Sequence, residues 1–127
     1  MTARKRLGRF AAAAALPAIL IGCGEPAVSY SKEVQPILQT HCVECHTGAG
    51  TGLAKSGLDM GSYEGLMKGT KLGPVIKPGN SVSSTLVLLI EGKADPSINM
   101  PHGGKEPMPK DQIAVIRTWV DQGAKNN

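Results

Sequence analysis

Two cysteines and a histidine stand close together as Cys42, Cys45 and His46, in the order C-x-x-C-H. This spacing is the attachment signature for c-type haem. Two thiols three residues apart lie on one face of a helical turn, so each can form a thioether with one porphyrin vinyl group. The histidine that follows places its imidazole under the ring, where it takes one axial position on the iron. The motif therefore predicts one covalently bound haem c, with His46 as the proximal iron ligand.

Two other kinds of site use the same residue types. A thioredoxin-like C-x-x-C needs a βαβ setting and a helix N-terminus that lowers a thiol pKa, but no strand-like run precedes Cys42. A structural zinc site needs four ligands, usually as two pairs. Only His41 and His102 remain as nitrogen ligands, and there is no second cysteine pair. The haem interpretation is favoured over both.

The iron would need a second axial ligand from another part of the chain. A methionine sulfur in that position raises the reduction potential and closes the site for electron transfer. Met100 and Met108 both lie in residues 92–109, where four prolines and three glycines predict a long loop. Each is followed by proline, which favours an extended conformation at the methionine. Met100 and Met108 are the candidate distal ligands, and His102 or an open position is a less favoured alternative.

The segments that must position these residues have the apolar spacing of short helices joined by Gly/Pro loops. Four are predicted, at residues 31–40, 61–67, 81–91 and 110–122. Pro36 suits a first helical turn, so the regular part of the first helix should begin near Gln35. Candidate caps and stops follow the usual residue preferences: Ser62, Ser81, Ser83 and Gly123.

Residues 47–57 are rich in glycine and predict a loop beside the motif. Its glycines would either permit close backbone approach to the haem or simply make the loop flexible. The second nitrogen of a haem-ligating histidine usually donates to a carbonyl, for which Pro74 is one candidate. Trp119 is interpreted as a packing residue and His41 as a solvated one. Met60 and Met67 are interpreted as core gap-fillers.

The first 22 residues predict a secretory signal peptide. Four basic residues and no acid precede an apolar, alanine-rich run at 10–21, which is too short to span a bilayer stably. The segment ends Leu20-Ile21-Gly22-Cys23, which resembles the cleavage site of bacterial lipoproteins. The resemblance implies cleavage after Gly22 and lipid on Cys23, and several acyl chains would hold the protein firmly. Gly24 in place of Asp favours the outer membrane, with the protein on the periplasmic side.

This division leaves a tether at residues 23–29, of roughly 20 Å when extended, and one domain at 30–127. The whole chain has 14 Lys+Arg against 10 Asp+Glu. The signal peptide holds four of the basic residues, so the mature chain is formally neutral and nothing indicates nucleic-acid binding. Cleavage would also remove Phe10, the sole phenylalanine, and leave a thin core that a buried macrocycle would fill.

Beyond the motif, the chain resembles small planctomycete-type c-type cytochrome domains related to class I cytochromes c. The resemblance covers most of residues 30–124. It rests on these stretches: Val34-Gln-Pro-Ile-Leu, the C-x-x-C-H motif, Gly57-Leu-Asp-Met, Ser62-Tyr-Glu, Pro78-Gly-Asn, Met100-Pro and Trp119-Val-Asp-Gln-Gly-Ala. It implies an all-α fold of three to four short helices around the haem. It also implies that Met100 is the distal ligand, since Met108 falls where that family usually has leucine.

The function expected from these features is electron transfer by a lipid-anchored, exported monohaem cytochrome that is not an enzyme. Its partners would be redox proteins that dock transiently through a small interface. Two alternatives remain open. The chain could be the haem subunit of a larger oxidoreductase, or an open sixth position could make it a ligand-binding or peroxidase site.

Overall fold

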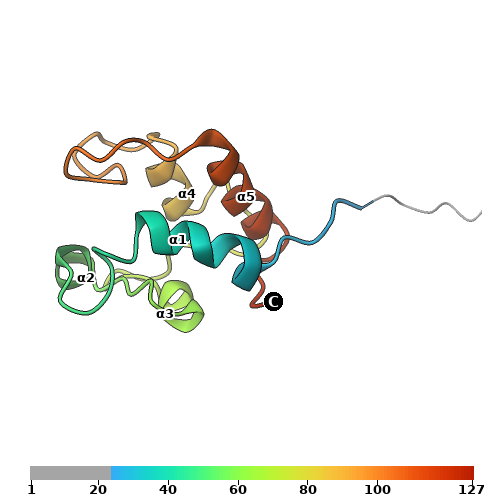
Figure 1. Ribbon diagram of the computed structural model, residues 1–127, viewed down its shortest axis with the longest axis horizontal. Coiled ribbons are helices and arrows are strands. Elements are labelled where there is room, and N and C mark those ends of the chain that lie inside the picture. The colour runs from blue at the N-terminus through green and yellow to red at the C-terminus, as the bar shows by residue number, and fades with distance from the viewer. Residues whose placement is uncertain (1–23) are drawn as a thin grey trace, which may run out of the picture.

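The computed structural model describes residues 24–127. The predicted signal peptide and the predicted lipid acceptor Cys23 lie outside the described residues. The elements are a π-helix and five α-helices (Figure 1): η1 (Tyr30–Val34), α1 (Gln35–His41), α2 (Thr51–Ser56), α3 (Tyr63–Lys68), α4 (Thr85–Ile90) and α5 (Lys110–Asp121). The described part contains no strand beyond one isolated bridge between Thr70 and Gly73. The all-α prediction is confirmed.

None of the helices within residues 24–127 is long and apolar enough to span a membrane.

The first helical segment begins one residue before the predicted one and has two parts. Regular α-helix starts at Gln35, as predicted from Pro36, which occupies the first turn of α1. The preceding residues wind as the π-helix η1 rather than as a simple turn. Ser29 caps η1 by accepting a hydrogen bond from the Lys32 amide at 3.3 Å. The two parts therefore form one continuous rod that leads to Cys42.

Helix α2 occupies a stretch that the glycine content predicted to be a loop, so that prediction was wrong. Gly57 ends the helix in the left-handed conformation, with φ of 77°. The Lys71 ammonium donates to the carbonyls of Ala54 (2.9 Å) and Lys55 (3.3 Å). A cation at a helix C-terminus satisfies the free carbonyls and complements the helix dipole. A residue distant in sequence therefore stabilises a short helix that the surrounding glycines obscured in the sequence.

The remaining helices lie close to their predicted positions. Ser62 caps α3 by accepting from the Gly65 amide at 3.0 Å, as predicted. Gly123 follows α5 with a φ of 102°, the conformation expected of a C′ glycine. The predicted caps Ser81 and Ser83 are wrong, because α4 begins later and its N-cap is Ser84.

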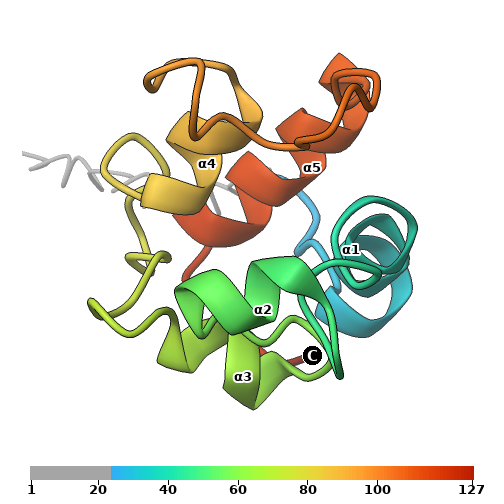
Figure 2. The ribbon, with the colours of Figure 1, turned by 90° about the vertical axis from the view of Figure 1, so that its left-hand side faces the viewer.

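The core lies where η1 and α4 pack against α5. Figures 1 and 2 show α4 and α5 on one side of the domain and α2 and α3 on the other. Tyr30, Tyr63 and Trp119 form one aromatic cluster, with the rings of Tyr30 and Trp119 5.5 Å apart. Trp119 is 1% exposed and donates its indole N–H to the Lys125 carbonyl. The interpretation of Trp119 as a packing residue is confirmed.

Glu91 joins the end of α4 to α5 and should make the domain acid-sensitive. Its carboxylate pairs with Lys93 at 2.8 Å and with Arg117. These hydrogen bonds, that of Lys93 first and that of Arg117 after it, lower the pKa of Glu91 although burial opposes them. When the pKa of a carboxyl is lower in the folded state, its ionisation stabilises the fold at every pH above the unfolded-state pKa, about 4.3 for glutamate. That stabilisation is lost as the pH falls through the folded-state pKa.

We expect Glu91→Gln to lower the free energy of unfolding at pH 7 by about 1 kcal/mol, because both basic partners are partly solvated. The difference from wild type should shrink as pH falls below about 4. Urea titrations at several pH values would measure it, with the exposed Glu106→Gln as control. A difference that stays constant down to acid pH would contradict the assignment.

Candidate functional site

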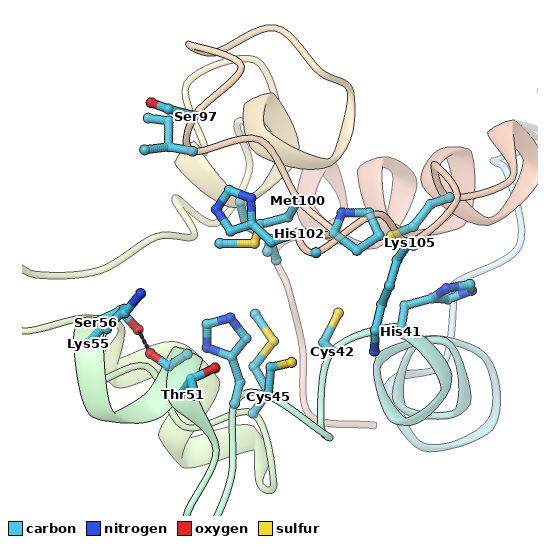
Figure 3. A pocket seen from close by; sticks show the side chains of 18 residues that line it. His41, Cys42, Cys45, Thr51, Lys55, Ser56, Ser97, Met100, His102 and Lys105 are labelled. Carbon is cyan, nitrogen blue, oxygen red and sulfur yellow. Dashed lines mark hydrogen bonds between the residues drawn. The ribbon is translucent and has the colours of Figure 1, made fainter.

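A cavity of about 580 Å³ lies between the turn that follows α1, helix α2 and the loop at residues 92–109. Cys42, Cys45 and His46 line it from the α1 side, and Met100 and Met108 line it from the loop. Figure 3 shows Cys42 and Cys45 on one side of the space and Met100 and His102 facing them from the other. Its volume is within the range of small-molecule and cofactor sites. The structure thus brings the motif and both candidate methionines to one cavity.

The C-x-x-C-H motif forms a tight turn at the end of α1. The Cys42 amide bonds to the Leu38 carbonyl at 2.8 Å, and the amides of Cys45 and His46 return to the Cys42 carbonyl at 3.1 and 3.0 Å. This winding puts both cysteines on the cavity wall, half-buried and not joined to one another. The expectation that helical spacing places the two thiols on one face is met.

The imidazole of His46 is buried, and a backbone carbonyl holds its orientation. Its Nδ1 lies 3.2 Å from the Leu58 carbonyl oxygen. A carbonyl accepts only, so Nδ1 carries a proton, and in the neutral ring Nε2 then has the free lone pair that a metal requires. Metal-ligating histidines are commonly oriented in this way. The suggested acceptor Pro74 is therefore wrong, because the chain returns to His46 through residues 57–60 and not through the later turn.

Two glycines let the backbone of the α2 region come close to the motif. A Cβ at Gly52 would lie 2.8 Å from His46 Nε2 and 2.9 Å from the Cys45 carbonyl oxygen. A Cβ at Gly50 would overlap the same carbonyl. These separations are shorter than real Cβ contacts, so neither position has room for a side chain. The close approach that the structure contains is to His46 and Cys45, and close approach of these glycines to a haem stays a prediction.

Gly52→Ala should therefore disturb the position of His46. Alanine in place of glycine in a helix gains about 1 kcal/mol, whereas overpacking costs about 1–3 kcal/mol. We expect a net loss of about 1 kcal/mol in the free energy of unfolding, measured by urea denaturation. Thr51→Ala, one residue away and exposed, is the matched control. A Gly52→Ala protein more stable than wild type would contradict the crowding.

The loop at 92–109 approaches the cavity from the end of α4. The Met100 amide donates to the Leu89 carbonyl at 3.1 Å, and Met100 is half-buried. Met108 is 4% exposed and lies just before α5. Met60 is 5% exposed and also lines the cavity, so it contacts both core and site. Met67 packs only against the core cluster, as predicted.

Two polar contacts hold residues that line the cavity. Lys105 from the loop binds the Glu44 carboxylate at 2.5 Å. This pairing raises the pKa of Lys105 and lowers that of Glu44. His41 lies 2.7 Å from the Gln112 Oε1 atom and is half-buried, so the interpretation of His41 as a solvated residue was wrong. Sequence reasoning also missed Lys105, Leu58 and Gln112, which carry no motif of their own.

The structure also bears on the two competing site types. Burial, which outweighs the opposing charge of Lys105, raises the pKa of the Cys42 thiol to about 11. A reactive thioredoxin-like thiol needs the opposite shift. Within residues 24–127, no three His, Cys, Asp or Glu side chains are grouped as a metal site would need. Neither a dithiol redox site nor a preassembled structural zinc site matches this arrangement.

The donor set fits a haem c. Cys42 and Cys45 present two thiols on one wall, and the free Nε2 of His46 lies beside them. Met100 and Met108 supply a thioether from the opposite wall. These residues would hold the group covalently from one side and ligate its iron from both.

Comparison with known families agrees with this fit. Residues 42–103 match the family model described as Planctomycete cytochrome C, a stretch from the first motif cysteine to the loop beyond Met100. No match was found among curated proteins or among solved structures.

Proposed function

We propose that the protein is an exported electron carrier that holds one haem c through Cys42 and Cys45. The match of residues 42–103 to the family model described as Planctomycete cytochrome C supports haem-based electron transfer in general. His46 and Met100 of this carrier would ligate the haem iron. A lipid on Cys23 anchors it to the membrane, with the outer membrane favoured. It catalyses no bond chemistry, and its partners are redox proteins that dock transiently.

The observation that carries this proposal is the two-walled cavity. A C-x-x-C-H motif alone would leave the second axial ligand open, but here a methionine-bearing loop lines the opposite wall. The loop is tied at three places around the site: through Met100 to Leu89, through Lys105 to Glu44, and through Met108 at the start of α5. A loop held in this way supports a closed electron-transfer site over an open catalytic one.

Each residue has a distinct role in the proposal. A bound haem would supply an iron that cycles between two oxidation states. Leu58 orients the His46 ring through its carbonyl. The cavity wall includes Met60, Leu86 and Met108, each at most 5% exposed, and such a wall keeps water away. Low polarity around the metal is one of the protein's means of setting the potential.

Optical spectroscopy of the periplasmically expressed protein tests the proposal. A pyridine haemochrome spectrum should show one c-type haem per chain. The ferric protein should be low-spin, with the weak far-red sulfur-to-iron band of methionine ligation. A high-spin ferric spectrum would favour the ligand-binding or peroxidase alternative. Co-purification with membrane oxidoreductase subunits would favour a subunit role.

The anchor is tested separately by metabolic labelling with a fatty acid. Labelled wild-type protein should float with membranes, and Cys23→Ala should lose both the label and the flotation. Fractionation of inner and outer membranes would then locate it. Unlabelled, soluble wild-type protein would contradict the anchor without affecting the haem assignment.

A further inference from the structure

The chain enters the domain at the end opposite the cavity. In Figure 1 the segment before η1 lies beside the C-terminus, whereas α2 and the loop at 92–109 lie at the far end. We call residues 26–31 with 122–127 the terminal pole, and residues 42–46, 51–56 and 97–105 the site pole. Between them run η1 and α1, five and seven residues long. At about 1.5 Å per residue this rod separates the poles by roughly 18 Å.

Two side chains at the terminal pole hold the incoming segment in place. Gln122 accepts from the Val28 amide at 2.8 Å and donates to the Pro26 carbonyl at 3.1 Å. Asn127 accepts from the Tyr30 amide at 2.8 Å and donates to the Val28 carbonyl at 3.2 Å. Each of these side-chain amides binds one backbone amide through its oxygen and one backbone carbonyl through its nitrogen. The two hydrogen bonds together fix the incoming segment more firmly than one would.

The main chain of Asn127 adds three further hydrogen bonds. Its carbonyl oxygen accepts from the Ser29 hydroxyl at 3.1 Å, the Ser31 hydroxyl at 3.0 Å and the Ser31 amide at 3.0 Å. The incoming segment is therefore held from Pro26 onward. Of the predicted tether, only Gly24 and Glu25 stand between Cys23 and the held segment, a reach of roughly 10 Å.

From this placement, and resting on the proposed anchor at Cys23, we infer that the domain stands on the lipid surface by its terminal pole and presents the cavity to the aqueous side. A linker of two residues is too short to let the domain turn over and place the site pole against the bilayer. The partner that the site accepts is then a redox protein arriving from the aqueous phase, and not one embedded in the same bilayer.

The surface of the site pole agrees with such a partner. Ile98 lines the cavity and is 51% exposed, so an apolar contact is available at the rim. The charge of Lys105 is paired with that of Glu44, and the exposed Lys55 adds one further positive charge to the cavity lining. Docking here should depend on a small apolar contact and only weakly on salt.

The experiment compares two attachments of the same haem-loaded domain to vesicles of phosphatidylethanolamine and phosphatidylglycerol. One form is anchored naturally through Cys23. The other lacks Cys23 and is tethered by a maleimide lipid at Ser97→Cys, an exposed position of the site pole. Energy transfer from a fluorescent lipid headgroup to the haem is measured in both. Since a domain of this size is roughly 26 Å or more across, transfer should be at least about twofold stronger in the Ser97-tethered form.

Equal transfer in the two forms would overturn the orientation, provided that the natural form floats with the vesicles. Failure of the natural form to become lipidated would overturn the anchor and, with it, the orientation. Amide hydrogen exchange tests whether Gln122 and Asn127 fix the incoming segment. Gln122→Ala with Asn127→Ala should speed exchange at Val28 and Tyr30 at least about tenfold. The exposed neighbour Asn126→Ala is the control, and fast exchange of these amides in wild type would contradict the hold.

Discussion

Replacing Cys42 and Cys45 together with alanine is expected to abolish covalently bound haem. Both thiols lie on the cavity wall at the end of α1, and no other cysteine within residues 24–127 could substitute for them. Either single replacement should leave one thioether and an altered absorption maximum. Haem staining after denaturing electrophoresis measures the covalent bond directly, and it does so whether or not the variant folds. This is the largest effect that the structure predicts.

Cys23→Ala is the matched control, because it removes a cysteine and leaves the C-x-x-C-H motif intact. It should stain for haem as strongly as wild type. Haem that survives denaturation in the Cys42→Ala/Cys45→Ala protein would contradict the attachment. The same result in the control and the double variant would show that export, and not the motif, limits loading.

Loss of the haem should also destabilise the fold. The walls of the cavity include Met60, Leu86 and Met108, which would face a void or collapse into it. A covalently attached haem stays on the unfolded chain, so its contribution comes from the apolar surface that it buries on folding. Loss of a large buried apolar group costs about 3–5 kcal/mol. At the urea dependence usual for a small domain, the midpoint should fall by roughly 2–3 M. Trp119, the sole tryptophan, reports unfolding by its fluorescence.

The chain's local patterns predicted the parts of the fold that local interactions determine. Pro36 placed the start of α1, Ser62 the start of α3 and Gly123 the end of α5. At each of these positions one residue has a conformational preference strong enough to act without its neighbours. The same reasoning failed for α2, because the glycines in and around it outweighed the helix formers Leu53, Ala54 and Lys55 in the prediction. The hydrogen bonds that Lys71 donates to its C-terminal end have no local sequence signal.

Some features of the candidate site were likewise predictable from local sequence, and others were not. C-x-x-C-H predicts the cofactor from spacing alone, and the structure places its three residues on one wall. The acceptor for His46 could not be predicted, since a backbone carbonyl such as that of Leu58 has no sequence signal. The salt bridge between Glu44 and Lys105 joins residues 61 apart in sequence. Contacts at that separation follow from the path of the loop, which spacing does not encode.

The position of the loop leaves two sulfurs beside the cavity, and replacing each in turn distinguishes them. Met100→Ala is expected to remove the far-red sulfur-to-iron band and to give a high-spin or histidine-ligated spectrum. The reduction potential should fall by on the order of 0.1–0.3 V, within the roughly 0.8 V range that axial ligands span. Spectroelectrochemical titration of the purified holoprotein gives both quantities. Met67→Ala, at a position packed against the core, should change neither.

Met108→Ala should behave differently if Met100 is the ligand. Met108 is 4% exposed, so its truncation should cost about 2–5 kcal/mol of stability as a core cavity while the band survives. Met100 is half-buried and held through its backbone to Leu89, so its truncation should affect the spectrum more than the fold. Met100→Ala should therefore change the spectrum strongly and the stability little, whereas Met108→Ala should change the stability strongly and leave the band in place. A band that survives in Met100→Ala and disappears in Met108→Ala would assign the sulfur to Met108, two residues before α5. The part of the loop around Met100 would then cover the site without supplying the ligand.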